Sequence, residues 1–349
     1  MSRIIVVLSG VALSVLASGT LASGEQENRA PSGADVVAPT LIADPIIDVP
    51  VAAIAPVVLD EPVFPVPPPK DRVQIWLSSF FAPPTDFNGV DLGLASPEIR
   101  VRGRVPVSRV ASVQLTASFG ASLYDTKGGA SLFADCPDCP SPRNLYSAAL
   151  VAQGGYLLNR RWHLFRSDEQ WAALGAVYGS AKWEPGAFEE SLSPGVSLGL
   201  GYQWPSKLRI ALGVEVARAF DGSGVAVGPY AYMRWDITSE VRLRSRGLGV
   251  QLEYEPTDRL QVFATAFQSG DRFRLDDRPE LSSGPTFSDR QVRAGGGLVF
   301  KIAHAVRLMG EVGAIVDREI SIDTRDDGTD DSTDGDISPY FSIRAEIRP

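Results

Sequence analysis

The run Gly195-Val196-Ser197-Leu198-Gly199 has the spacing of a hydrolase nucleophile motif, whose central serine attacks an acyl carbon. That chemistry needs a sharp turn from a strand into a helix, which presents the serine hydroxyl at the top of a sheet. Here, large and small residues alternate through Ser197 and beyond it, which is the pattern of an uninterrupted strand. We therefore expect Ser197 to be an ordinary strand position, and a hydrolase remains only an alternative function.

The two histidines of the sequence, His163 and His304, are the candidate bases for such a serine. His163 lies near Ser167 and Asp168, but no spacing in this stretch is typical of a catalytic triad. Similarly, Gly295-Gly296-Gly297 lacks the spacing and the following helix of a dinucleotide-binding loop, so we expect closely packed strands there. The sequence thus predicts no enzyme, no cofactor and no metal centre, with both histidines on the surface.

The only two cysteines, Cys136 and Cys139, enclose Pro137-Asp138 in a long polar stretch. Neither the further ligands of a structural zinc site nor the βαβ unit of a thioredoxin-like motif accompanies them. In an oxidising compartment, a disulfide between such close cysteines is favoured. We predict that the mature protein has no free thiol, which alkylation under non-reducing, denaturing conditions checks. Two reactive thiols per chain would contradict the prediction.

Residues 326–336 form an acidic stretch whose beginning imitates a calcium-binding loop. The imitation rests on Asp330, Ser332, Asp334 and Gly335. Counted from Asp330, the twelfth position is Phe341, whereas an EF-hand needs a bidentate glutamate there. The sequence therefore favours a solvated outer loop over a specific calcium site.

A period of two residues dominates the chain and is clearest between Ser191 and Phe220. One parity is large and apolar, from Val196 to Trp204 and again from Leu208 to Val216, while the other parity is small or polar. The runs exceed the usual strand of about 5–6 residues and suit the roughly 9–11 residues of a tilted strand that crosses a bilayer. This pattern predicts an antiparallel, up-and-down transmembrane β-barrel. The alternative is a soluble periplasmic β-barrel or sandwich that acts as a binding module, with the large apolar parity inside.

The connections between the strands set the expected strand number at 12–14. Three are long and polar, at about 125–143, 276–289 and 322–336, and they share one end of the barrel only if the chain reverses near Arg246-Gly247. This reversal gives fourteen strands. The candidates are 73–82, 97–105, 111–124, 144–158, 169–183, 191–204, 207–220, 225–236, 240–245, 248–255, 259–275, 290–302, 305–321 and 337–348.

Arginines recur at alternate positions of several strands. On strand 97–105, Ile99, Val101 and Val105 mark the lipid face, so the three arginines at the alternate positions point inward. The lumen-lining candidates are Arg100, Arg102, Arg104, Arg209, Arg242, Arg244, Arg272, Arg274, Glu215 and Glu253. Arg344, Arg348, Glu311 and Glu346 join them by the same parity. Rings of arginine favour anions in a pore, whereas ion-pair ladders that fill the lumen are the alternative.

Three segments make up the expected organisation. Residues 1–22 have one arginine, a short apolar stretch and small residues at the cleavage position, which predicts a signal peptide and export. Residues 23–69 hold ten prolines between Pro31 and Pro69 and are expected to be a periplasmic linker. Residues 70–349 are the barrel domain. The formal net charge of −9 argues against a nucleic-acid partner.

Short motifs in the second half of the barrel domain are Trp235, Leu243, Gly247-Leu248-Gly249 with Leu252 and Tyr254, Asp258-Arg259-Leu260 and Arg272-Phe273-Arg274-Leu275. This set resembles an uncharacterised bacterial family, a domain of unknown function predicted to form an outer-membrane β-barrel. The resemblance covers residues 73–348 and implies a fold and a location, but no activity. The expected partners are outer-membrane lipid and the barrel-assembly machinery. That machinery usually reads a terminal aromatic residue, whereas this chain ends Ala345-Glu346-Ile347-Arg348-Pro349.

Overall fold

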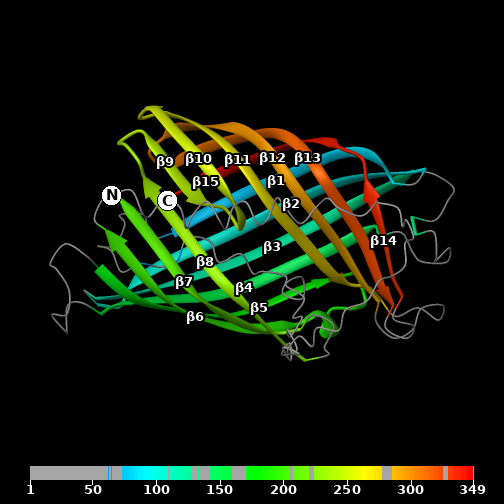
Figure 1. Cartoon of the computed structure of the whole chain (residues 1–349), viewed down its shortest axis with the longest axis horizontal. Coiled ribbons are helices and arrows are strands. Elements are labelled where there is room, and N and C mark those ends of the chain that lie inside the picture. The colour runs from blue at the N-terminus through cyan, green and yellow to red at the C-terminus, as the bar shows by residue number, and fades with distance from the viewer. Residues whose placement is uncertain are drawn as a thin grey trace, which may run out of the picture. The chain divides into compact units, whose positions relative to one another are not determined.

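The computed structural model describes residues 62, 64, 73–87, 89–108, 110–127, 132–133, 142–158, 170–204, 207–219, 224–276, 285–324 and 329–348. Most of these residues form one β-barrel of tilted strands (Figure 1). The strands are β1 (Val73–Phe87), β2 (Val90–Pro106), β3 (Ala111–Lys127), β4 (Asn144–Leu157), β5 (Gln170–Trp183), β6 (Ser193–Trp204), β7 (Leu208–Arg218), β8 (Val225–Asp236), β9 (Val241–Ser245), β10 (Leu248–Thr257), β11 (Leu260–Arg274), β12 (Thr286–Ala303), β13 (Val306–Thr324), β14 (Thr329–Gly335) and β15 (Ser338–Ile347). One 3-10 turn, η2 (Glu189–Ser191), precedes β6, and no described helix is long and apolar enough to cross a membrane.

The strands follow one another around the barrel, and every ladder that joins sequence neighbours is antiparallel. The ring closes because β12 pairs with β13, β13 with β15, and β15 with β1. β14 and β15 both pair with β13, along successive parts of the same strand, and so act as one interrupted strand. The described chain therefore forms a closed barrel of fourteen strands, which confirms the predicted all-β, up-and-down class.

The predicted reversal near Arg246-Gly247 is confirmed. Gly247 has a φ of 55°, a left-handed conformation that glycine adopts without a steric penalty, and it turns β9 into β10. The connections after β1, β3, β5, β7, β9, β11 and β13 thus lie at one end of the barrel, called the long-loop end below. The connections after β2, β4, β6, β8, β10 and β12 and the C-terminal end of β15 lie at the short-turn end.

Two predicted connections are strand instead. The stretch 83–96 was expected to link two strands, but β1 and β2 continue through it and turn at Gly89, whose φ is 87°. A register shift between Ala82 and Thr85 accommodates Pro83 and Pro84 within β1. The acidic stretch 326–336 also differs from the expected loop, because most of it is β14, paired with the end of β13.

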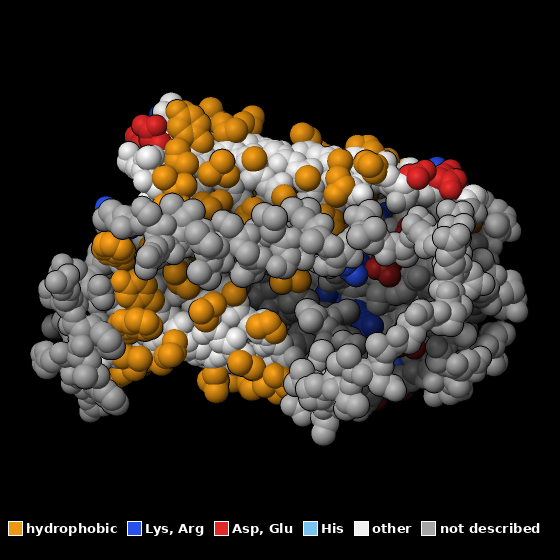
Figure 2. All heavy atoms as spheres, in the orientation of Figure 1, with side chains coloured by type: hydrophobic (Ala, Val, Ile, Leu, Met, Phe, Trp, Pro, Cys, Tyr) orange, Lys and Arg blue, Asp and Glu red, His pale blue; other side chains and the backbone are white. Residues whose placement is uncertain are grey.

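The large apolar parity faces outward. Leu198 on β6 is 71% exposed, Leu150 on β4 is 63% exposed and Leu212 on β7 is 61% exposed. Figure 2 shows such side chains spread over the barrel wall in that view. In a soluble barrel, these large apolar side chains would point inward. Their outward position therefore does not fit the soluble alternative and fits an outer surface that faces lipid.

The interior at the long-loop end is apolar. Phe87, Leu92, Phe273, Ile320 and Ile322, each at most 1% exposed, belong to one packed cluster. Leu132 and Phe133, from the long connection after β3, join the same cluster. At this end the sheet therefore has a soluble-type core inside it, in contrast to the polar interior farther along the strands.

Candidate functional site in the barrel interior

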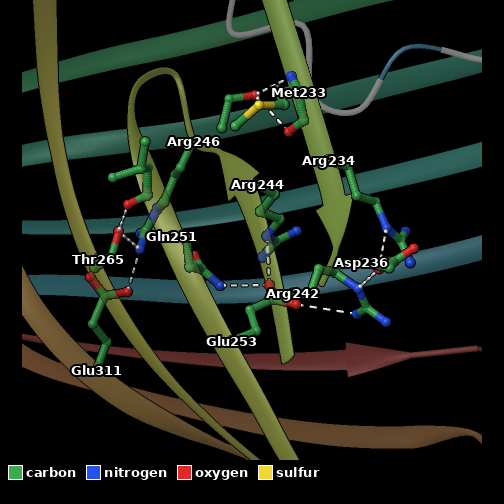
Figure 3. A network of polar contacts seen from close by, with 12 residues as sticks. Met233, Arg234, Asp236, Arg242, Arg244, Arg246, Gln251, Glu253, Thr265 and Glu311 are labelled. Atoms are coloured by element: carbon green, nitrogen blue, oxygen red, sulfur yellow. Dashed lines mark hydrogen bonds and ion pairs between the residues drawn. The ribbon is translucent and has the colours of Figure 1, made fainter. Parts of the chain in front are cut away.

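A network of arginines and carboxylates lies on the inner face of β8, β9 and β10 (Figure 3). Arg242 donates through Nε to Asp236 Oδ1 at 2.5 Å and through Nη1 to Glu253 Oε2 at 3.2 Å. Arg244 Nε forms an ion pair with Glu253 Oε1 at 2.6 Å, and Gln251 donates to the same oxygen at 2.8 Å. Glu253 is only 4% exposed, so these donors hold a carboxylate that the wall withdraws from bulk water.

Arg246 extends this network toward β11 and β13. It leaves the turn after β9 and donates through Nη1 to Glu311 Oε2 at 2.9 Å and to Thr265 Oγ1 at 3.4 Å. The other oxygen of Glu311 accepts from the Tyr340 hydroxyl at 2.7 Å. Arg234 Nε lies 3.4 Å from Asp236 Oδ1. The network therefore contains four arginines and three carboxylates. Glu255, the next inner carboxylate of β10, is paired with Lys301 Nζ at 2.6 Å and leaves this local excess of positive charge unchanged.

The three arginines of β2 lie on the parity opposite to the exposed Ile99 and Val101. Arg100 donates to Glu98 Oε1 at 2.9 and 3.1 Å. Arg102 stacks over the Trp76 ring, 4.7 Å from its centroid. Arg104 donates through Nη2 to Ser112 Oγ at 3.3 Å and to the backbone carbonyl of Phe64. One carboxylate, Glu98, shares this face of β2 with them.

The candidates on β7 lie on the inner parity as well. Glu215 is 5% exposed and accepts a short hydrogen bond from the Tyr178 hydroxyl of β5. Arg209 sits between Gln203 of β6 and Arg234 of β8 in the strand register. By strand parity, Arg344, Glu346 and Arg348 share the inner face with Tyr340, and Arg348 donates to Glu346 at 2.5 Å.

Arg272 and Arg274 are not on the inner parity that the sequence predicted. Phe273, between them, is buried in the apolar cluster, so its two neighbours lie on the opposite face of β11. Arg274 is nevertheless only 4% exposed there. Arg272 donates to Ser288 Oγ at 3.1 Å, and Arg274 donates to Glu190 of η2 at 2.6 Å. The reason is the inverted polarity at the long-loop end, where apolar side chains fill the interior.

The barrel wall is incomplete between β8 and β11 in the described residues. β8 pairs with β9 only from Arg234 to Asp236, and no described strand pairs with the same edge of β8 from Val225 to Ala231. On the other side, the pairing of β10 with β11 ends at Gln268. Figure 2, in the orientation of Figure 1, shows a hollow there, with charged side chains visible inside it.

The gap in the wall between β8 and β11 is called the notch below. Beyond it, toward the long-loop end, β5 and β11 are in contact. Arg274 pairs with Trp183 in a parallel bridge, and Lys182 Nζ lies 2.7 Å from Asp271 Oδ1. At the long-loop end, the wall therefore passes directly from β5 to β11 and bypasses the shorter strands β6 to β10. The interior is thus narrowed at that end and lined by charged residues beside the notch.

Asp236, Arg234 and Arg246 of the network were not among the residues predicted from the sequence. Asp236 is the last residue of β8, and Arg246 follows the end of β9. At such positions the alternation of inward and outward side chains is interrupted, so the sequence does not show which way they point. The notch, however, had a signal in Pro229, which lies in the middle of β8. Proline has no N–H to donate to a ladder and is confined to strand edges or bulges, so it marked β8 as an edge strand.

The remaining chemical candidates form no reactive site in the described chain. Ser197 lies within β6, paired with Ala176 and Glu215, so the strand-to-helix turn of a nucleophile motif is missing there. Within the described ranges, no group of three or more His, Cys, Asp or Glu residues could hold a metal ion. The signal peptide (1–22), Cys136, Cys139 and His163 lie outside the described residues.

Neither a family model nor a curated protein matches the sequence. Among solved structures, the fold is similar to a Pseudomonas aeruginosa FadL homologue, with 10% identity over 80% of this chain and 90% of that chain and a TM-score of 0.43. It is also similar to the Ralstonia pickettii toluene transporter TbuX (9% identity, 80% and 90% coverage, TM-score 0.38) and to the translocator domain of the autotransporter NalP from Neisseria meningitidis (12% identity, 80% and 90% coverage, TM-score 0.29). The closed, apolar-faced barrel itself defines the class: an outer-membrane-type β-barrel.

Proposed function

We propose that this chain is a non-enzymatic channel of the outer membrane with a preference for anions. The observation that carries the proposal is the inner wall, where arginines outnumber carboxylates both on β2 and in the β8–β10 network. Low-dielectric walls focus the field of such charges, and rings of arginine favour anions. The notch between β8 and β11 gives solutes a way past the packed long-loop end.

The test is the reversal potential in planar bilayers across a KCl gradient. We expect chloride preference, and Arg244→Gln should shift the potential toward potassium, because the 42% exposed Arg244 side chain faces the interior. The matched control is Arg290→Gln, which removes an arginine from the outer parity of β12 and should leave the potential unchanged. Cation preference of the unmodified protein would refute the anion preference.

A closed structural barrel is the second candidate, and the apolar cluster at the long-loop end favours it. Leu132 and Phe133 fill the interior there, as side chains fill small barrels. Absence of conductance from correctly folded protein, identified by heat-modifiable gel mobility, would select this candidate.

Export by the predicted signal peptide and insertion by the barrel-assembly machinery are part of the same proposal. The exposed Phe341 of β15 offers an aromatic side chain on the lipid-facing parity of the last strand, although it is not the terminal residue. We expect Phe341→Ala to slow assembly in cells, measured as accumulation of unfolded protein in the periplasm. Tyr340 points inward and is the neighbouring residue against which assembly can be compared.

A further inference from the structure

Phe64 lies inside the barrel, although it belongs to the proline-rich stretch before the first strand. Its side chain is 3% exposed and packs in one cluster with Ala172, Leu174, Ala211 and Tyr232. These partners belong to β5, β7 and β8, near the short-turn end. The stretch that was expected to be only a linker therefore places an aromatic ring against the inner wall.

The wall beneath the ring is a recess made of small residues. Ala172, Gly201 and Ala211 are direct cross-strand neighbours on β5, β6 and β7, and Tyr232 of β8 continues the row. A Cβ atom on Gly201 would lie 2.6 Å from Cε1 of Phe64, which is too close for any real contact. The ring thus takes the space that a side chain at position 201 would need.

A second contact holds the backbone of the same residue. Arg104, on the inner parity of β2, donates through Nη2 to the carbonyl oxygen of Phe64. The Phe64 N–H donates to the Pro62 carbonyl at 2.9 Å, so both polar groups of its backbone have a partner. Because β2 lies several strands away from β6 and β7, one residue joins two separate parts of the wall.

We propose that Phe64, with Pro62, is an internal plug that the chain seats in its own lumen. The ring covers the recess, and the backbone reaches Arg104, so the residue closes this part of the lumen to solutes. Only the conductance readout of this inference rests on the proposed channel function. The seating itself is tested without any current.

The seating test measures how fast a charged maleimide labels a cysteine beneath the ring. Ala211 is 0% exposed, and Ala211→Cys is made in a background with Cys136→Ser and Cys139→Ser. Adding Phe64→Ala should raise its labelling rate by about tenfold or more, a change that corresponds to roughly 1.4 kcal/mol. Ala149→Cys, on the inner parity of β4 and away from the recess, is the control and should be labelled equally fast with and without Phe64.

Equal labelling of Ala211→Cys in both backgrounds would overturn the plug. Heat-modifiable gel mobility verifies that each variant is folded. In planar bilayers, Phe64→Ala should conduct more than the unmodified protein, and faster labelling with unchanged current would refute the narrowing of the lumen. Faster labelling without current from either protein would support the seating and refute the channel instead.

Discussion

Replacing Arg318 with alanine should cost about 3–5 kcal/mol of unfolding free energy, because it breaks a buried ion pair. Arg318 donates to Asp289 through Nη2 at 2.8 Å and through Nε at 3.2 Å, and the side chains are 0% and 2% exposed. Asp289 also accepts from Tyr124 at 2.9 Å and from Gln291 at 2.8 Å. Without the guanidinium, a carboxylate would remain charged next to the apolar cluster. Urea unfolding in lipid vesicles measures the loss.

The same two strands offer a matched control. Arg290 of β12 pairs with Glu319 of β13 at 3.3 Å, but these side chains are 52% and 39% exposed. Arg290→Ala should therefore cost less than about 1 kcal/mol. The double variant Asp289→Leu, Arg318→Met should lose much less unfolding free energy than Arg318→Ala, because it leaves no unpaired charge buried. If Arg318→Ala and Arg290→Ala lost equal amounts of unfolding free energy, burial would not explain the cost of removing Arg318.

The alternation of β6 and β7 was sufficient to predict the barrel, because lipid imposes one polarity on a whole wall. Leu198 and Leu212 face outward as that argument requires. The polarity is reversed at the long-loop end, where the same sheet encloses an apolar core. There, Phe273 turns inward and places Arg272 and Arg274 on the opposite face of β11, against the prediction, with Arg274 buried against Glu190 of η2.

Features that depend on two distant segments could not be predicted from local patterns. The pair of Arg318 and Asp289 requires the register between β12 and β13, which the sequence does not state. Phe64 is one aromatic residue in a stretch without periodicity. The recess that receives its ring is visible in the sequence as the small residues at alternate positions around Gly201. Small inward residues suit a water-filled lumen equally well, so they did not indicate a bound ring.

Leu150→Arg should prevent stable insertion, whereas the same substitution at the preceding residue should not. Leu150 is 63% exposed near the middle of β4, and its cross-strand neighbours are Ala117 and Gly179. An arginine on the lipid face costs about 2–4 kcal/mol at the bilayer midplane, because its charge must leave water or pull water into the membrane. The fraction of folded protein recovered in vesicles, scored by heat-modifiable gel mobility, measures the effect.

Ala149→Arg is the matched control because it introduces the same side chain into the same strand on the opposite parity. Ala149 lies between Ser118 of β3 and Ser180 of β5, so a new guanidinium there meets hydroxyl groups. Its side chain is partly exposed to the interior, which leaves room for the longer residue. We expect near-normal folding of this variant. If both variants folded equally well or equally badly, the inward and outward assignment of β4, and with it the lipid-facing surface, would be wrong.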